Sequence, residues 1–228
     1  MIIYGKQVCL HALEHHSEKI KTVYVAKKGI LPNDLFHKYH DNIKFLEEKW
    51  AQSMSKGGNH QGLLVEMTEF AQSSLLEIKK NDFIVVLDGL TDVGNIGAIV
   101  RSAYALGADA IISTGVKQLN FAAIARTSSG AMLDMPFMIA PNILDTFNEL
   151  QQLGFTFYGA SMDGKNVQDM TFDTRRVLVL GSEGKGLSKK VIAKLNHSVS
   201  IEMKHSFDSL NVSAAAAILI HRMGYAIK

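Results

Sequence analysis

The stretch LDGLTDVGNIGAIVR, residues 87–101, leads from an apolar strand into a helix and decides the fold class of the chain. Its start completes the run FIVVLD at 83–88, which is typical of a strand buried on both faces of a sheet. A buried strand that leads directly into a helix is the repeating unit of α/β folds. Gly94 and Gly97 lack the G-x-G-x-x-G spacing of dinucleotide-binding turns, so the stretch predicts a site of another kind.

Five more apolar runs, rich in β-branched and aromatic residues, follow the first one, and helical segments separate most of them. They lie at residues 110–114, 136–140, 156–161, 176–181 and 198–203. Alternating strands and helices predict a mostly parallel sheet with helices on both faces. Asn142 and Ser188 are expected to cap the helices that follow them. Because ligands of open α/β sheets bind beyond the carboxyl ends of the strands, we expect the functional residues there.

The chain before residue 68 has a different pattern. A helix-like stretch, QVCLHALEHH, and three strand-like runs, TVYVA, IKFLE and GLLVEM, predict a small α/β domain. The polar stretch TEFAQSSLLEIKKN has neither helical nor strand periodicity, which indicates a linker. We therefore predict a first domain at residues 1–67, a linker at 68–81 and a second domain at 82–228.

The composition excludes several classes of protein. With 24 basic and 22 acidic residues the net charge is only +2, which does not by itself mark a nucleic-acid-binding protein. Cys9 is the single cysteine, so we expect a buried small hydrophobic residue and no internal disulfide. Neither a secretory signal nor a run near the roughly 20 apolar residues of a membrane span is present, which predicts a cytoplasmic protein. His11 and His15 have helical i, i+4 spacing but no third ligand, so no metal is expected.

The first segment whose residues could bind a ligand or take part in a reaction is NIGAIVR, residues 95–101. If the helix begins near Asn95, this residue can cap free backbone N–H groups. Gly97 lies one turn before Arg101, which predicts a notch beside the guanidinium where the helix N-terminus would help to hold a phosphate. The alternative is a capped helix with an exposed arginine.

The second segment, LVLGSEGKGL at residues 178–187, is a strand that runs into a glycine-rich turn. It is not a P-loop, because no Gly-Lys-Ser/Thr ends it. The glycines would allow a ligand to approach the backbone, and the carboxylate of Glu183 would suit a cation or a hydroxyl donor. The alternative is an ordinary turn with a solvated glutamate.

The third segment begins at Ile201 and enters a long C-terminal helix through SLNVSAAAA, residues 209–217. Ser209 and Asn211 are both polar groups at the helix start. One of them is expected to cap the helix, which leaves the other for binding. The alanines at 214–217 permit close packing of another helix, as in a core or a subunit interface.

In this order, the three segments resemble the motifs of the SpoU family, also called TrmH-like RNA 2′-O-ribose methyltransferases. IYGKQVCLHAL and KGGNHQGLL, in the first domain, are similar to the N-terminal RNA-binding module of the ribosomal RNA enzymes in that family. The resemblance implies S-adenosylmethionine as methyl donor, RNA as substrate and a homodimer. It also implies a SPOUT-type α/β-knot methyltransferase domain with a deep trefoil knot and a mostly parallel sheet, preceded by a small α/β RNA-binding domain.

The resemblance assigns roles to individual residues. Catalytic roles fall to Asn95, Arg101, Glu183, Ser209 and Asn211. Donor binding falls to Leu180, Gly181, Ser182, Glu183, Gly184, Ile201, Met203, Ser209, Leu210 and Asn211. RNA contacts fall to Arg101, Asn59, His60 and Gln61. For Arg101 we favour a charged guanidinium that stabilises the developing alkoxide and grips a phosphate over a general base, because guanidinium groups keep their proton in proteins.

Three positions depart from the family pattern. The first motif usually has proline where this chain has Val93, and the third usually has proline and glycine where it has Glu202 and His205. A carboxylate at Glu202 is electrostatically compatible with a cationic donor. The resulting prediction is a ribose 2′-O-methyltransferase that acts on a guanosine of large-subunit ribosomal RNA. The alternatives are a transfer RNA ribose methyltransferase and a non-catalytic RNA-binding protein that has kept the fold.

Overall fold

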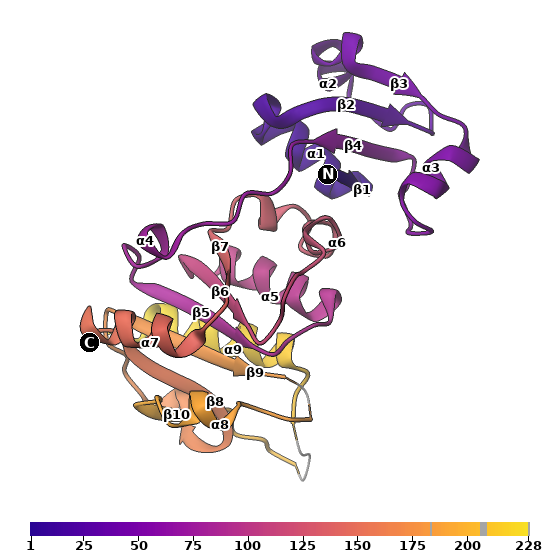
Figure 1. The fold of residues 1–228 in the computed structure, drawn as a ribbon. Helices are drawn as coiled ribbons and strands as arrows, with labels where there is room; N and C mark the ends of the chain where they lie inside the picture. Colours follow the sequence, from indigo (N-terminus) through magenta and orange to yellow (C-terminus); the bar gives the residue numbers. More distant parts are fainter. Residues whose placement is uncertain (183, 206–208, 228) are drawn as a thin grey trace. The chain divides into compact units, whose positions relative to one another are not determined.

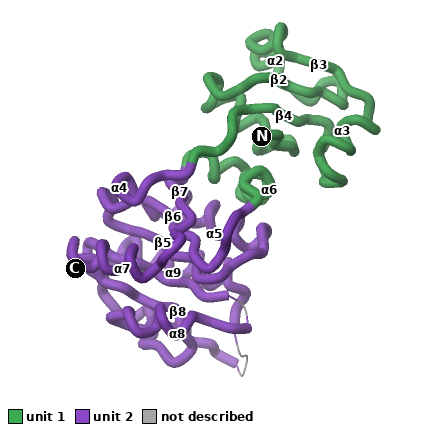
Figure 2. Tube along the Cα trace, viewed as in Figure 1, with its two compact units in different colours: residues 1–71, 120–134 green, residues 72–119, 135–228 purple. Residues whose placement is uncertain are grey.

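The chain folds into two compact units, which Figure 2 colours separately. The computed structural model describes residues 1–182, 184–205 and 209–227. The first unit comprises Met1–Ala71 and Asn120–Asp134, and the second comprises Gln72–Leu119 and Met135–Lys228. The segment Asn120–Asp134 therefore packs with the N-terminal part of the chain, although the sequence boundaries group it with the second domain.

The first unit contains a four-stranded sheet in the order β1-β4-β2-β3, in which only β2 and β3 run parallel. The strands are β1 (Ile2–Tyr4), β2 (Ile20–Val25), β3 (Ile43–Phe45) and β4 (Leu63–Met67). The helices are α1 (Lys6–His15), α2 (Asn33–Lys38), α3 (Glu48–Met54) and α6 (Phe121–Thr127), with short 3-10 turns η1 (Ser17–Lys19), η2 (His40–Asn42) and η3 (Ala131–Leu133). The small α/β pattern is confirmed, while β1 was not predicted because three residues are too few to reveal strand periodicity.

Helix α1 supplies much of the core of this unit through Val8, Cys9, Ala12 and Leu13. The Cys9 thiol is fully buried, and burial raises its pKa far above the usual range. A thiol in this environment is an inert small hydrophobic group, as predicted.

The second unit contains a six-stranded sheet in the order β10-β8-β9-β5-β6-β7, and all its strand pairs are parallel (Figure 1). The strands are β5 (Phe83–Asp88), β6 (Ala110–Thr114), β7 (Phe137–Ala140), β8 (Thr156–Asn166), β9 (Arg176–Gly181) and β10 (His197–Ser200). Each corresponds to one of the six apolar runs. The predicted parallel sheet is confirmed.

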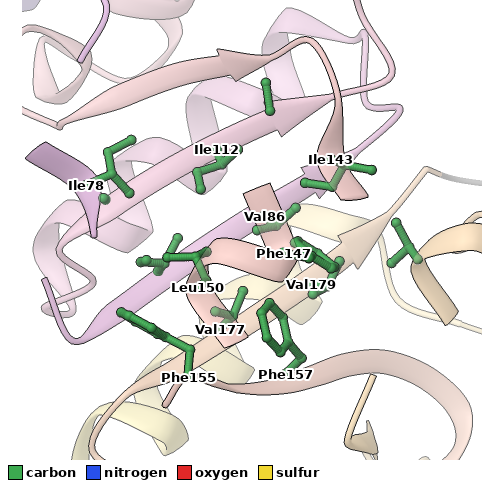
Figure 3. Packing of buried hydrophobic residues seen from close by; sticks show 14 residues of the cluster. Ile78, Val86, Ile112, Ile143, Phe147, Leu150, Phe155, Phe157, Val177 and Val179 are labelled. Atoms are coloured by element: carbon green, nitrogen blue, oxygen red, sulfur yellow. The ribbon is translucent and has the colours of Figure 1, made fainter. Parts of the chain in front are cut away.

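Helices cover both faces of this sheet (Figure 1). They are α4 (Leu75–Ile78), α5 (Val93–Ala105), α7 (Ile143–Gln152), α8 (Lys189–Ile192) and α9 (Val212–Tyr225), with one 3-10 turn, η4 (Val167–Asp169). On one face, residues of α4, α7 and α8 pack against alternate residues of the central strands in a single cluster (Figure 3). On the other face, α5 and α9 pack against each other. No helix among the described residues has the length and apolar character that a membrane crossing requires.

Helix α4 lies inside the stretch predicted as a linker. Ser74 and Glu77 form a capping box, in which each side chain binds the other residue's backbone N–H. Ile78 is fully buried in the cluster on the α7 face. The second half of the stretch 68–81 is therefore structured, and its one helical turn is too short to produce a periodic pattern.

Tyr158 on β8 makes stability depend on pH in the alkaline range. Its hydroxyl donates to Asp173 Oδ2 at 2.8 Å, and burial, with this carboxylate, raises the pKa of Tyr158 to about 12. The protonated Tyr158 hydroxyl contributes fully to the free energy of unfolding below the pKa of an unfolded tyrosine, about 10. This contribution is lost as pH rises through about 12. Chemical unfolding of wild type and Tyr158→Phe from pH 8 to 12 should show wild type losing roughly 2 kcal/mol relative to the variant. A constant difference across this range would contradict the assignment.

Candidate active site

The first and second segments meet at the carboxyl ends of two neighbouring parallel strands, β5 and β9. The strand register pairs Asp88 with Gly181, the last residues of these strands. The turn before α5 and the glycine-rich turn after β9 therefore start side by side. This is the edge of an α/β sheet at which ligands bind.

Helix α5 is capped by Asp92. Its carboxylate accepts a hydrogen bond from the Asn95 backbone N–H at 2.7 Å, and the helix begins at Val93. The expectation that Asn95 caps the helix is therefore wrong: Asp92 takes this role and places Asn95 in the first turn. The Asn95 side chain is left to bind elsewhere, and its Oδ1 accepts a hydrogen bond from Asn211 Nδ2 at 2.9 Å.

Asn211 connects the third segment to the first. Its Oδ1 accepts from the Ser213 backbone N–H at 2.9 Å and so caps α9, while its Nδ2 donates to Asn95. This confirms that one of the two polar residues at the helix start is the cap. Ser209 is exposed, two residues before the cap. One amide side chain thus fixes the N-termini of α5 and α9 relative to each other.

The glycine-rich turn after β9 has almost no room inside it and open space outside it. A Cβ on Gly181 would lie 2.3 Å from the carbonyl carbon of Gly186, closer than real contacts allow. Gly184 and Gly186 have φ values of 81° and 63°, and a Cβ on either would meet none of the described residues within 4 Å. The backbone of the turn can therefore be approached closely by a ligand. The predicted Glu183 lies outside the described residues.

Asp88, which none of the three sequence segments singled out, supports this turn. Its carboxylate is buried, with 6% of the residue exposed, and Oδ2 accepts from the Ser188 backbone N–H at 2.7 Å. Ser188 precedes α8 as predicted, but its side chain makes no capping hydrogen bond. Its buried Oγ has no hydrogen-bond partner among the described residues. An aspartate at the end of an otherwise apolar strand was the available signal.

Arg101 lies on α5 and is exposed. Gly97, one turn earlier, is buried. The phosphate notch between these two residues stays a prediction. Arg101 lies on the same helix whose first turn holds Asn95.

The other residues expected at the donor site differ in exposure. Leu180 is buried, Ser182, Ile201, Met203 and Leu210 are half-buried, and His205 is exposed. Glu202 is exposed, and its Oε2 accepts from Asn166 Nδ2 at 3.1 Å. The carboxylate that departs from the family pattern is thus bound to the last residue of β8.

The loop at 56–62 in the first unit is held by its own side chains. His60 is buried; Nδ1 accepts from the Gly62 backbone N–H at 3.0 Å and Nε2 lies 3.1 Å from Glu48 Oε1. His60 was expected to contact RNA, but its ring is not available for this, because it is packed inside the loop. Exposed Gln61 and Asn59 remain accessible, although the Gln61 Oε1 accepts from the Lys6 backbone N–H at 2.9 Å.

Two family models cover most of the chain. Residues 82–221 match the SpoU rRNA Methylase family, and residues 2–73 match the model of RNA 2′-O ribose methyltransferase substrate binding. A 23S rRNA (guanosine-2′-O-)-methyltransferase RlmB from Pasteurella multocida is 31% identical over 233 residues, covering 96% of this chain and 95% of its own. An RlmB from Yersinia pestis is 32% identical, covering 78% of this chain and 76% of its own.

Solved structures share the fold. The SpoU methyltransferase AviRb from Streptomyces viridochromogenes, in complex with AdoMet, matches with a TM-score of 0.77 at 24% identity, covering 97% of this chain and 88% of its own. The A. aeolicus TrmH/SpoU tRNA modifying enzyme matches with a TM-score of 0.56 at 22% identity, covering 66% of this chain and 80% of its own. The family model that matches residues 82–221, together with a relative that aligns along nearly the whole chain, shows that this protein belongs to the SpoU rRNA methylase family.

Proposed function

We propose that this protein transfers a methyl group from S-adenosylmethionine to a ribose 2′-hydroxyl of structured RNA, and that its substrate is a guanosine of 23S ribosomal RNA. The observation that carries the proposal is the Asn211–Asn95 hydrogen bond, which joins the third segment to the first next to the glycine-rich turn of the second. The guanosine specificity rests on the RlmB relatives, which are named for it and align over most of the chain.

The residues at the carboxyl edge of the sheet fit the methyl donor. Leu180, Gly181, Ser182 and Gly184 would hold it from the second segment, and Ile201, Met203, Leu210 and Asn211 from the third. No described residue fills the space beside the Cα atoms of Gly184 and Gly186, so a ligand could approach this backbone closely, and the half-buried Ile201 and Leu210 offer apolar contact. When bound, S-adenosylmethionine supplies an electrophilic methyl group.

Arg101 would act on the RNA. A ribose hydroxyl is a poor nucleophile, so its alignment and the charge that develops on its oxygen decide the rate. The exposed guanidinium would bind the phosphate of the target nucleotide and stabilise that charge. Asn95, held by Asn211, would orient groups around it. In the first unit, Asn59 and Gln61 would contact RNA, while His60 would shape their loop.

The family also implies a homodimer and a deep trefoil knot in the second unit. Ile218 and Tyr225 on α9 are 38% and 76% exposed, which leaves apolar surface for a second copy on the helix that carries the alanine run. Light scattering of the full chain at micromolar concentration should give the mass of a dimer. Ile218→Glu should shift that mass towards the monomer.

The activity is tested with labelled S-adenosylmethionine and fractionated RNA from cells that lack this enzyme. We expect label in 23S rRNA, recovered as 2′-O-methylguanosine after digestion. Label only in transfer RNA would favour the transfer RNA alternative. RNA binding without label would favour the non-catalytic alternative.

Asp88 should control donor affinity without touching the donor. Asp88→Ala leaves the Ser188 N–H without its acceptor, and an unsatisfied buried group costs about 1–3 kcal/mol. We expect the affinity for the donor, measured by calorimetry, to fall roughly 10-fold, which corresponds to about 1.4 kcal/mol of binding free energy. Asp109 is the matched control: its carboxylate binds the Phe83 N–H at 2.8 Å, at the other end of β5. Asp109→Ala should keep donor affinity, and equal losses in both variants would reject a specific role for Asp88.

A further inference from the structure

Three side chains of the first unit converge on one point, and one of them is far from the other two in the sequence. His11 lies on α1, His16 directly follows this helix, and Asp134 follows η3. His11 Nε2 is 2.6 Å from Asp134 Oδ2, and His16 Nε2 is 2.9 Å from Asp134 Oδ1. One potential ligand atom from each residue lies within 4.8 Å of the other two.

The cluster is shielded from solvent. The His16, Asp134 and His11 side chains are 10%, 22% and 25% exposed. His16 Nε2 is close enough to Asp134 for an ion pair, yet it is buried and makes no hydrogen bond within the described residues. A buried ring nitrogen in this state is costly unless another partner satisfies it.

The backbone around the cluster is shaped to the His11 ring. Gly130 has a φ of 101°, and a Cβ at this position would lie 2.7 Å from His11 Cδ2. Only glycine permits both this conformation and this approach. The turn that leads into η3 therefore folds directly over the imidazole, which holds His11 in place.

We infer that His11, His16 and Asp134 form a zinc site. Two imidazole nitrogens and one carboxylate oxygen are a ligand set that Zn²⁺ accepts, with water in the fourth position. In a tetrahedral site with bonds near 2.0–2.1 Å, ligand atoms lie roughly 3.3 Å apart, so the widest separation of 4.8 Å must shorten by a side-chain adjustment. Zinc would then satisfy His16 Nε2.

Sequence spacing alone pairs His11 with His15 and offers no third ligand for a metal. His11 and His15 have the helical spacing, but His15 is 58% exposed and lies outside the cluster. The helix ends at His15, and the backbone of His16 leaves it with φ −129° and ψ 40°. This break brings His16 to the carboxylate, and the third ligand comes from a segment that sequence analysis assigns to the other domain.

The test is a titration of the full-length, metal-free protein with Zn²⁺ alone, by calorimetry against a competing chelator. We expect one ion per chain and an affinity that falls more than about 10-fold in His16→Ala and in Asp134→Asn, since even outer-shell partners of a metal contribute 10–100-fold. His15→Ala is the matched control on the same helix and should bind zinc as wild type does.

Co²⁺ gives a second readout that does not depend on affinity. A tetrahedral cobalt site should produce visible absorption in wild type and in His15→Ala, and none in Asp134→Asn. If His16→Ala fails to fold, Asp134→Asn still tests the site, because asparagine has nearly the same size and shape as aspartate. Absence of zinc binding in wild type, unchanged binding in Asp134→Asn, or loss of binding in His15→Ala would overturn the site.

Discussion

Arg101→Ala is expected to abolish methyl transfer while S-adenosylmethionine still binds. Loss of one preorganised group that stabilises developing charge lowers the rate about 10²- to 10³-fold, and loss of the phosphate contact adds to this. Donor binding should survive, because the residues proposed to hold the donor belong to the second and third segments. Single-turnover methylation and calorimetry with the donor measure the two effects separately.

The control for Arg101 is Arg175, which directly precedes the first residue of β9. Its Nη1 donates to the Leu153 carbonyl at 2.9 Å. Arg175→Ala should retain methyl transfer. Full activity of Arg101→Ala, or loss of its donor binding, would contradict the proposed role.

Arg101→Lys distinguishes a fixed cation from a general base. A fixed cation predicts partial activity with little change in the pH profile, although the lost guanidinium fork keeps the rate below wild type. A general base predicts a plateau at lower pH, since a lysine ammonium loses its proton more readily than a guanidinium. A pH plateau shifted in Arg101→Lys would therefore show that Arg101 acts as a general base and not as a fixed cation.

Gly181→Ala should be the most damaging single-methyl change at the donor site. The added Cβ would lie 2.3 Å from the Gly186 carbonyl carbon and 2.5 Å from its oxygen, so backbone atoms must move. We expect calorimetry to show donor affinity reduced by more than about 10-fold, which corresponds to roughly 1.4 kcal/mol.

Gly154 provides the control for this substitution. It has a φ of 83° and open space around its Cα, so Gly154→Ala adds backbone strain without a contact. Thermal unfolding should place both variants below wild type, but only Gly181→Ala should lose donor affinity. Wild-type affinity in Gly181→Ala would mean that the turn does not hold the donor.

The parallel sheet of the second unit could be predicted because its strands are buried on both faces. A strand such as β5, with all six residues buried, leaves a continuous apolar run in the sequence. The Asn142 cap could be predicted as well, and its Oδ1 accepts from the Leu144 N–H at 3.1 Å. At 92–95 the same rule selected the wrong residue, because Asp92 and Asn95 are both good caps.

Contacts between distant segments could not be predicted in this way. The Asn211–Asn95 bond and the Asp88–Ser188 bond depend on how strands and helices are arranged in space, which local periodicity does not specify. His60 was assigned to RNA from its place in a flexible-looking loop, yet tertiary packing buries it. The resemblance to the family supplied the candidate site residues; the structure supplied the partners that hold several of them.

The first unit is discontinuous in sequence, and this affects how the protein is made. Chains emerge from the ribosome N-terminus first, and domains generally fold as units during synthesis. Residues 1–71 cannot complete their unit when they emerge. The surfaces of α1 and β1 pack against α6, and this helix belongs to Asn120–Asp134, which is synthesised later. The first sheet must remain partly uncovered while β5, α5 and β6 are synthesised. Translation stalled before residue 120 should therefore leave a nascent chain that proteases cut within the first unit, and release of the stall should restore resistance.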